Sequence, residues 1–186
     1  LKDAVIRLDA LGFQPHFHAL GDRAVRQALD AVEAARRANG WSDTRPHLAH
    51  LQVIHPDDVP RFAALGVGAN MQPLWACHEP QMDELTIPYL GEPRWRWQYP
   101  FGDLERAGAR LVGGSDWSVS SPDVLWGSHV AVTRMPPPDG DDHSGKEPFL
   151  PEQAITLESA LTAYTQGSAW VNHLDDVTGT LEVGKF

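Results

Sequence analysis

The chain has 186 residues, of which 42% are hydrophobic and 22% are charged, so it can bury a core and is not expected to be disordered. Its formal net charge of −10, without any cluster of lysine or arginine, disfavours nucleic acid as a partner. The single cysteine, Cys77, excludes an internal disulfide, and no apolar run approaches the ~20 residues that cross a bilayer. With no signal peptide visible, we expect a cytoplasmic protein without a membrane partner.

The first half of the chain alternates helical and extended patterns. Apolar residues at helical spacing predict a helix over residues 1–11, which Gly12 ends, and a short strand follows over 13–18. A second amphipathic helix is predicted over 22–38, with Asp22 as its N-cap. The next strand is predicted over 47–51.

The alternation continues through the second half. We predict a helix over residues 57–65, a strand over 67–71, a helix over 101–107, a strand over 110–114 and a helix over 122–133, with one or two helices over 156–171. Residues 72–99 hold four prolines and three tryptophans with little periodicity, and we interpret them as a long ordered loop. Residues 135–150 are rich in proline, glycine and aspartate, which predicts a surface loop.

A strand and a helix repeated four times indicate parallel β/α units with right-handed crossovers. Both an open doubly wound sheet and a β/α barrel are built in this way. Periodicity alone does not choose between them.

Three of the four predicted strands end on a residue that can bind a metal. His18 ends the first, His50 ends the second, and Asp116 follows the fourth after Gly113, Gly114 and Ser115. Reactive groups of parallel β/α folds gather at these strand ends, and two imidazoles with one carboxylate suit zinc. A bound metal would activate water, and Asp116 would bind the metal or take the proton. A single strand histidine, however, is more often a hydrogen-bonded core residue.

Side-chain alternation predicts which residues share a face of the sheet. His16 and His18 are expected on one face, and Leu48 and His50 are expected to share a face as well. His16 has the His-x-His spacing that opens many metal-dependent barrels, but a closed barrel takes ~250 residues and only three strands follow here. We therefore interpret His16 as a barrel-facing neighbour of His18.

Four further residues are candidates for substrate binding because they are expected at the strand ends or in the loops beyond them. They are Gln72, Trp75, Trp117 and His129. Gln72 is as well explained by capping of a strand end, and the tryptophans by packing of a long loop.

The motifs FHALGDRAVRQALDAVE, HLAHLQVIHPDDVPRFAALGVGANMQPLW and GGSDWSVSSPDVLWGSHVAVTR resemble the YtcJ-like branch of the amidohydrolase superfamily, as does the ending LTAYTQGSAWVN…TGTLEVGKF. The resemblance implies an α/β fold, a partial TIM-type (β/α)8 barrel in which residues 1–175 supply strands five to eight. Residues 176–186 would begin a truncated flanking β-sandwich. His18 and His50 match the metal ligands of strands five and six, and Asp116 matches the strand-eight residue that binds metal and acts as general base.

Departures from the family pattern are also visible. The family's strand-one His-x-His pair and strand-four lysine have no counterpart in residues 1–186, and Ala49 stands where many relatives carry glutamate before the strand-six histidine. These absences indicate a barrel fragment.

The resemblance therefore implies a metal-dependent hydrolase, acting on an amide or another C–N bond of a small molecule with one or two divalent ions, most simply zinc. Two alternatives remain open. One is a catalytically incomplete barrel fragment, inactive alone, whose partner is the missing N-terminal half or a second copy of the chain. The other is a non-enzymatic regulatory or binding relative.

Overall fold

The computed structural model describes residues 1–138 and 147–186. Its centre is a sheet of four parallel strands, β1 (His16–Ala19), β2 (His47–His50), β3 (Gly68–Met71) and β4 (Arg110–Gly113), in the order β1-β2-β3-β4. The register places His16 opposite His47 and Gly68 opposite Arg110. A doubly wound sheet reverses its strand order near the middle, whereas this order never reverses. The sheet is therefore an arc of a β/α barrel, which confirms the predicted fold class.

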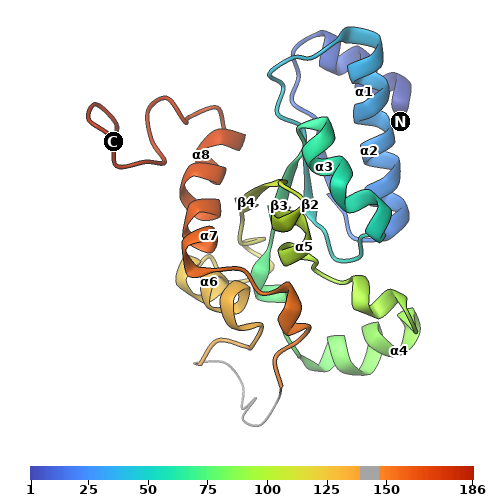
Figure 1. Ribbon diagram of the computed structural model, residues 1–186, viewed down its shortest axis with the longest axis vertical. Helices are drawn as coiled ribbons and strands as arrows, with labels where there is room; N and C mark the ends of the chain where they lie inside the picture. The colour runs from blue at the N-terminus through green and yellow to red at the C-terminus, as the bar shows by residue number, and fades with distance from the viewer. Residues whose placement is uncertain (139–146) are drawn as a thin grey trace.

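Helices connect the strands and cover the sheet (Figure 1). The helices of the described residues are α1 (Lys2–Ala10), α2 (Asp22–Asn39), α3 (Val59–Leu65), α4 (Ile87–Leu90), α5 (Phe101–Arg106), α6 (Val124–Thr133), α7 (Leu157–Thr162) and α8 (Ser168–Val171). Pro60 lies in the first turn of α3, the position that tolerates proline, and Asp123 caps α6 by accepting bonds from the backbone N–H groups of Leu125 and Trp126.

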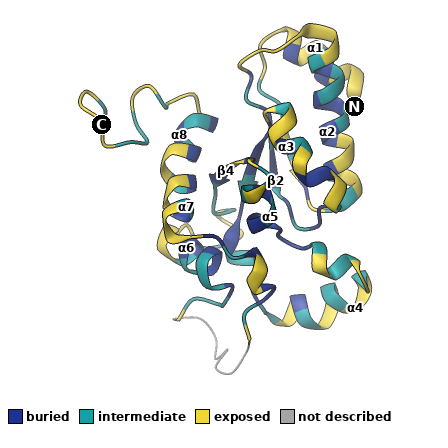
Figure 2. Cartoon of the chain, in the orientation of Figure 1, coloured by how far each residue is buried: buried dark blue, intermediate teal, exposed yellow. Residues whose placement is uncertain are grey.

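The hydrophobic core has two main parts. Val25, Leu29 and Phe62 from α2 and α3 pack with Leu48 and Ala69 of the strands, and all are nearly inaccessible to solvent. The second part joins Met71 with Phe101 of α5, Val130 of α6 and side chains of the C-terminal helices. Figure 2 shows this burial in dark blue along the strands and on the inner sides of the helices. Helices thus cover the strands on their outer side, as β/α units require.

The segment 72–99 differs from the predicted loop. It contains helical turns over Pro73–Trp75, Gln81–Thr86 and Arg94–Trp97 in addition to α4. Prolines stand in the first turn of the Pro73–Trp75 turn and of α4, where their missing N–H has no cost, so their number did not argue against helix. The prediction of a loop without regular structure was wrong here. Of the surface loop predicted over 135–150, residues 139–146 lie outside the described part.

The C-terminal region runs from α7 through a π-helical stretch, Ala163–Gly167, into α8. Residues 172–186 form turns and contain no strand. The proposed domain boundary between residues 175 and 176, and a sandwich beyond it, stay predictions.

No helix in the described ranges is both long and apolar enough to cross a bilayer. Cys77 is buried. The cytoplasmic location stays a prediction.

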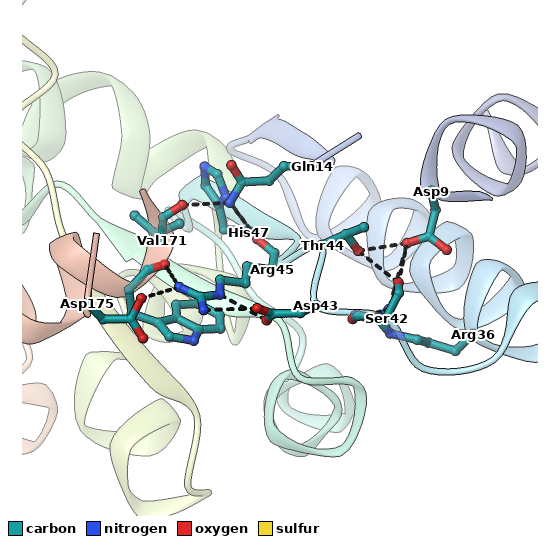
Figure 3. Close-up of polar contacts among 11 residues, drawn as sticks. Asp9, Gln14, Arg36, Ser42, Asp43, Thr44, Arg45, His47, Val171 and Asp175 are labelled. Carbon is teal, nitrogen blue, oxygen red and sulfur yellow. Dashed lines mark hydrogen bonds and ion pairs between the residues drawn. The ribbon is translucent and has the colours of Figure 1, made fainter. Parts of the chain in front are cut away.

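A polar network ties the C-terminal region to the N-terminal end of the sheet (Figure 3). The Arg45 guanidinium pairs with Asp43 and Asp175 and donates to the carbonyl oxygen of Trp170 at 2.5 Å. The amide of Gln14 donates to the carbonyl oxygens of Arg45 and Val171. The loop before β2 and the end of α8 are therefore fastened to each other.

Candidate functional site

His18 and His50 come together at the C-terminal end of the sheet. His18 is the third residue of β1 and His50 is the last residue of β2. Their ring centroids lie 4.4 Å apart in an edge-to-face arrangement. The two histidines that the sequence placed at successive strand ends are thus in direct contact.

A left-handed backbone turn aims His50 at His18. His50 has a φ of 72° and Leu51 a φ of 56°, a region that residues other than glycine rarely adopt. Leu48 is buried in the core against the helices, whereas the ring of His50 contacts His18 at the edge of a cavity. The prediction that Leu48 and His50 share a face was therefore wrong, because alternation holds only while the strand stays extended.

Asp116 reaches the same cavity from the loop after β4. Its φ is 63°, again left-handed, and its carbonyl oxygen accepts bonds from the N–H groups of Val119 and Ser120. The indole N–H of Trp75 donates to Asp116 Oδ2 at 3.3 Å. This bond fixes the orientation of the carboxylate.

The cavity has a volume of about 360 Å³. Its walls come from the strand ends and the segment 72–99, and they comprise His18, Leu20, His50, Gln52, Trp75, Glu79, Gln81, Met82, Thr86, Tyr99, Asp116 and Val119. A volume of this size suits a small molecule.

The electrostatics favour a neutral imidazole at His50. Burial lowers the pKa of His50, the negative charge of Asp116 opposes this shift, and His18 and His16 add to the lowering. An unprotonated ring can donate its lone pair to a metal. Burial also raises the pKa of the Tyr99 hydroxyl far above its usual value, and the negative charge of Glu79 adds to this shift, so the hydroxyl stays protonated.

The donor chemistry of the three residues fits a borderline divalent ion, with two imidazoles and one carboxylate around one cavity. The spacing of the three side chains, however, is wider than that of ligands that hold one ion. Within residues 1–138 and 147–186, no three His, Cys, Asp or Glu side chains stand close enough to hold one ion together. The rings of His18 and His50 are in contact, and the Asp116 carboxylate is hydrogen-bonded to Trp75.

The other predicted residues fall into two groups, those that line the cavity and those that do not. Trp75 lines the cavity, whereas Trp117 is 71% exposed and does not belong to its wall. His129 is hydrogen-bonded through Nε2 with the carbonyl oxygen of Pro136, away from the cavity. Gln72 is buried and is not among the lining residues. His16 is hydrogen-bonded to His47, with 2.6 Å between Nδ1 and Nε2.

Comparison with known proteins identifies the chain. The model of the amidohydrolase family matches residues 1–186, the whole sequence. The chain belongs to the amidohydrolase family. The resemblance that the sequence motifs carried is thereby confirmed.

Three relatives match all or nearly all of the chain. LONG AFTER FAR-RED 3 of Arabidopsis thaliana is 32% identical over 186 residues, which are 30% of its length. The amidohydrolase YtcJ of Bacillus subtilis (strain 168) is 27% identical over 93% of the chain and 31% of its own length. The N-substituted formamide deformylase of Arthrobacter pascens is 27% identical over the whole chain and 32% of its own length. The chain therefore spans about a third of these relatives.

A solved structure agrees with the assignment. A metal-dependent hydrolase of Pyrococcus horikoshii OT3 superposes with a TM-score of 0.73 at 27% identity, covering 99% of this chain and 35% of that one.

Several cavity residues could not be identified from the sequence. Glu79, Met82, Thr86 and Tyr99 all come from the segment 72–99. That segment has no periodicity that would tell which side chains face inward. Its position directly after a strand that ends at the rim was the only available signal.

The prediction that Asp22 is the N-cap of the second helix was wrong, because α2 begins at Asp22 itself, its N-cap is Gly21, and no side chain caps it. The Asp22 carboxylate instead holds the segment 72–99 in place. Its two carboxylate oxygens accept bonds from Arg94 Nε and Nη2 at 3.2 and 3.1 Å. Because Asp22 begins α2 directly after β1, this pair joins the wall segment to the strand that carries His18.

Proposed function

We propose that this chain is the metal-binding part of a hydrolase that cleaves an amide or another C–N bond of a small molecule. The observation that carries the proposal is the convergence of His18, His50 and Asp116 on one cavity in a member of the amidohydrolase family. The relatives are about three times longer, so the activity proposed is that of the whole protein.

His18 and His50 would hold a divalent ion, most simply zinc, with Asp116 as a third donor. When bound, such an ion lowers the pKa of water and polarises a carbonyl oxygen. The neutral state of His50, favoured by its burial, keeps its ring available for this role. The metal-dependent hydrolase of Pyrococcus horikoshii OT3, at 27% identity, supports the need for a metal.

Asp116 would act as general base. Trp75 binds Oδ2, so Oδ1 is the oxygen that takes the proton from the attacking water. The same carboxyl would then give the proton to the nitrogen that leaves. The amide that is hydrolysed thus gains one water in total, as a carboxylic acid and an amine are released.

The relative named as an N-substituted formamide deformylase supports a small amide as substrate class. The cavity is of a matching size, and Gln52, Gln81 and Thr86 offer it polar groups that can bind an amide.

The test uses the full gene product, loaded with zinc and offered a panel of N-substituted formamides and other small amides, with amine release as the readout. Asp116→Asn keeps the size of the side chain and removes the base, and we expect turnover to fall by about 100-fold or more. Asp123→Asn is the matched control, because Asp123 lies on the same loop, caps α6, and is not a cavity residue. Equal turnover in the Asp116→Asn variant and the wild type would refute the mechanism.

We also propose that the sheet is completed by further strands, supplied by an N-terminal barrel half or by a second copy of the chain. β1 and β4 each pair with one strand only among the described residues, so each offers an open edge. Light scattering of residues 1–186, alone and mixed with the N-terminal half of the relatives' barrel, separates the two partners. A stable monomer that ignores the added half would refute the proposal.

A further inference from the structure

Gln72 stands between the two strand ends that carry His50 and Asp116. It follows β3 directly, and its side chain is only 4% exposed. Its Oε1 accepts a hydrogen bond from the backbone N–H of His50 at 2.6 Å, and its Nε2 donates to Asn70 Oδ1 at 2.9 Å. Both polar ends of the amide are therefore occupied by protein groups.

The hydrogen bond from the His50 N–H to Gln72 satisfies a backbone donor that has left the regular strand. The left-handed turn at His50 and Leu51 takes the backbone out of the extended form of β2. A backbone N–H at such a place must still find an acceptor, since a buried and unpaired one is costly. Gln72 supplies that acceptor and thereby holds the turn that aims the His50 ring at His18.

The Nε2 side of the Gln72 amide lies against Gly114, the residue that follows β4. The N–H of Gly114 donates to the carbonyl oxygen of Met71, the residue before Gln72. A Cβ added to Gly114 would lie 2.9 Å from Gln72 Nε2 and 3.0 Å from Asn70 Oδ1. Glycine is thus needed at position 114 because the amide pair occupies that space. Asp116 follows two residues later.

We propose that Gln72 is a positioning residue, which fixes His50 and the Asp116 loop relative to each other through the Asn70–Gln72 amide pair. The proposal rests on the metal site inferred above and assigns its geometry to a residue outside the cavity wall. It also gives Gln72 a role that does not involve contact with substrate.

The chain offers a matched control. Gln153 is 5% exposed, accepts a hydrogen bond from the backbone N–H of Asp103 at 3.0 Å, and donates to the Asp103 carboxylate at 2.9 Å. It makes the same two kinds of bond as Gln72 but joins α5 to the Pro151–Gln153 turn, away from the cavity. Gln72→Met and Gln153→Met should therefore destabilise the chain to a similar extent.

The two variants should differ at the site. In metal-free protein, NMR of the imidazole and backbone N–H groups should show shifts at His18, His50 and Asp116 in Gln72→Met and none there in Gln153→Met. Zinc affinity, measured by titration calorimetry on the same proteins, should fall by about 10- to 100-fold in Gln72→Met only, as is usual when a group that orients a metal ligand is removed.

A conservative variant and a double variant complete the test. Gln72→Glu keeps the acceptor for His50, and Asn70 can rotate its amide to donate to the new carboxylate, so this variant should restore the His50 signals. Gly114→Ala should disturb the same signals in the wild type and less in a Gln72→Ala background, because the closer of the two contacts, with Gln72 Nε2, is then removed.

The metal-free measurement separates the two proposals. If no variant or wild type binds zinc, the metal site is refuted, but the NMR shifts still decide whether Gln72 positions His50. If Gln72→Met leaves the His50 and Asp116 signals as Gln153→Met does, the positioning role is refuted, whatever the zinc affinity.

Discussion

At the N-terminal end of the sheet the polar side chains bind one another, whereas at the C-terminal end they line a cavity. Arg45 places its guanidinium between Asp43, Asp175 and a backbone carbonyl. His18, His50 and Asp116 instead surround open space. Left-handed backbone occurs at both ends, at Arg45 with a φ of 46° and at His50 with a φ of 72°.

The two ends of the sheet therefore differ in the kind of side chain that the left-handed backbone places there. At one end it places a cation in a saturated network, and at the other it places a proposed metal ligand at the edge of a cavity. In β/α barrels the N-terminal face generally serves stability and the C-terminal face serves chemistry. We expect the same division in this chain, so variants at the two ends should have opposite effects.

The largest effect is expected from His50→Asn. Zinc affinity should fall by on the order of 100-fold or more, since a direct ligand matters more than the groups that orient it. Asparagine tolerates left-handed backbone better than histidine, so the free energy of unfolding should stay within about 0.5 kcal/mol of the wild type. Calorimetry and urea denaturation measure the two quantities. A strongly destabilised His50→Asn protein would show that this end also serves stability.

Arg45→Met should give the reverse pattern. It removes the pairs with Asp43 and Asp175 and the bond to the Trp170 carbonyl. Asp43 is exposed and Asp175 is partly exposed, so we expect a loss of about 2 kcal/mol in urea denaturation, below the cost of breaking a fully buried pair. Arg45→Lys keeps the charge but lacks the planar guanidinium group. Its free energy of unfolding should lie between those of the wild type and Arg45→Met. A change in zinc affinity of more than about twofold would argue against the separation of the two ends.

The pH dependence of stability sharpens the comparison at the N-terminal end. Burial lowers the pKa of His47 from the ordinary 6.5, the charge of His16 on β1 lowers it further, and the Arg45 carbonyl opposes the shift. Below pH 6.5 the unfolded chain therefore binds more protons than the folded one. The stabilising contribution is complete above pH 6.5 and is lost as the pH falls through the window below it.

We therefore expect the wild type to lose stability between pH 7 and pH 5 in a way that depends on His47. Denaturation of the wild type and of His47→Gln across this range measures it. Identical slopes in the two proteins would mean that His47 does not contribute.

The smallest effect is expected from Asp22→Asn. The pair with Arg94 is partly exposed, so its loss should cost about 0.5 kcal/mol. The effect should be local, with faster hydrogen exchange over residues 81–97 and little change elsewhere. Arg96→Gln removes a more exposed pair with Glu92 in the same segment and is the control. Equal exchange in both variants would mean that Asp22 does not hold the segment.

The alternation of β/α units and the trio His18, His50 and Asp116 followed from the sequence, because amphipathic periodicity and strand-end position are both local signals. The strand ends themselves were located to within a residue or two. His18 and Asp116 could be placed at the rim without knowing any tertiary contact.

The left-handed turn at His50 and the role of Gln72 could not be predicted in this way. The turn depends on an acceptor that lies 22 residues further along the chain. The residues that line the cavity could not be predicted either. Glu79, Thr86 and Tyr99 are oriented by packing and do not follow a periodic pattern in the sequence. Long-range contacts of this kind leave no periodic trace in the sequence.

The network around Arg45 also bears on the order of folding. Gln14 and Val171 are 157 residues apart, and Arg45 and Asp175 are 130 apart. Contacts of such separation close the longest loops of the chain, and their entropic cost is met only after the local β/α units have formed. Interactions absent from the transition state act mainly on the unfolding rate. The fastening of α8 to the loop before β2 thus sets how long the folded chain persists more than how quickly it forms.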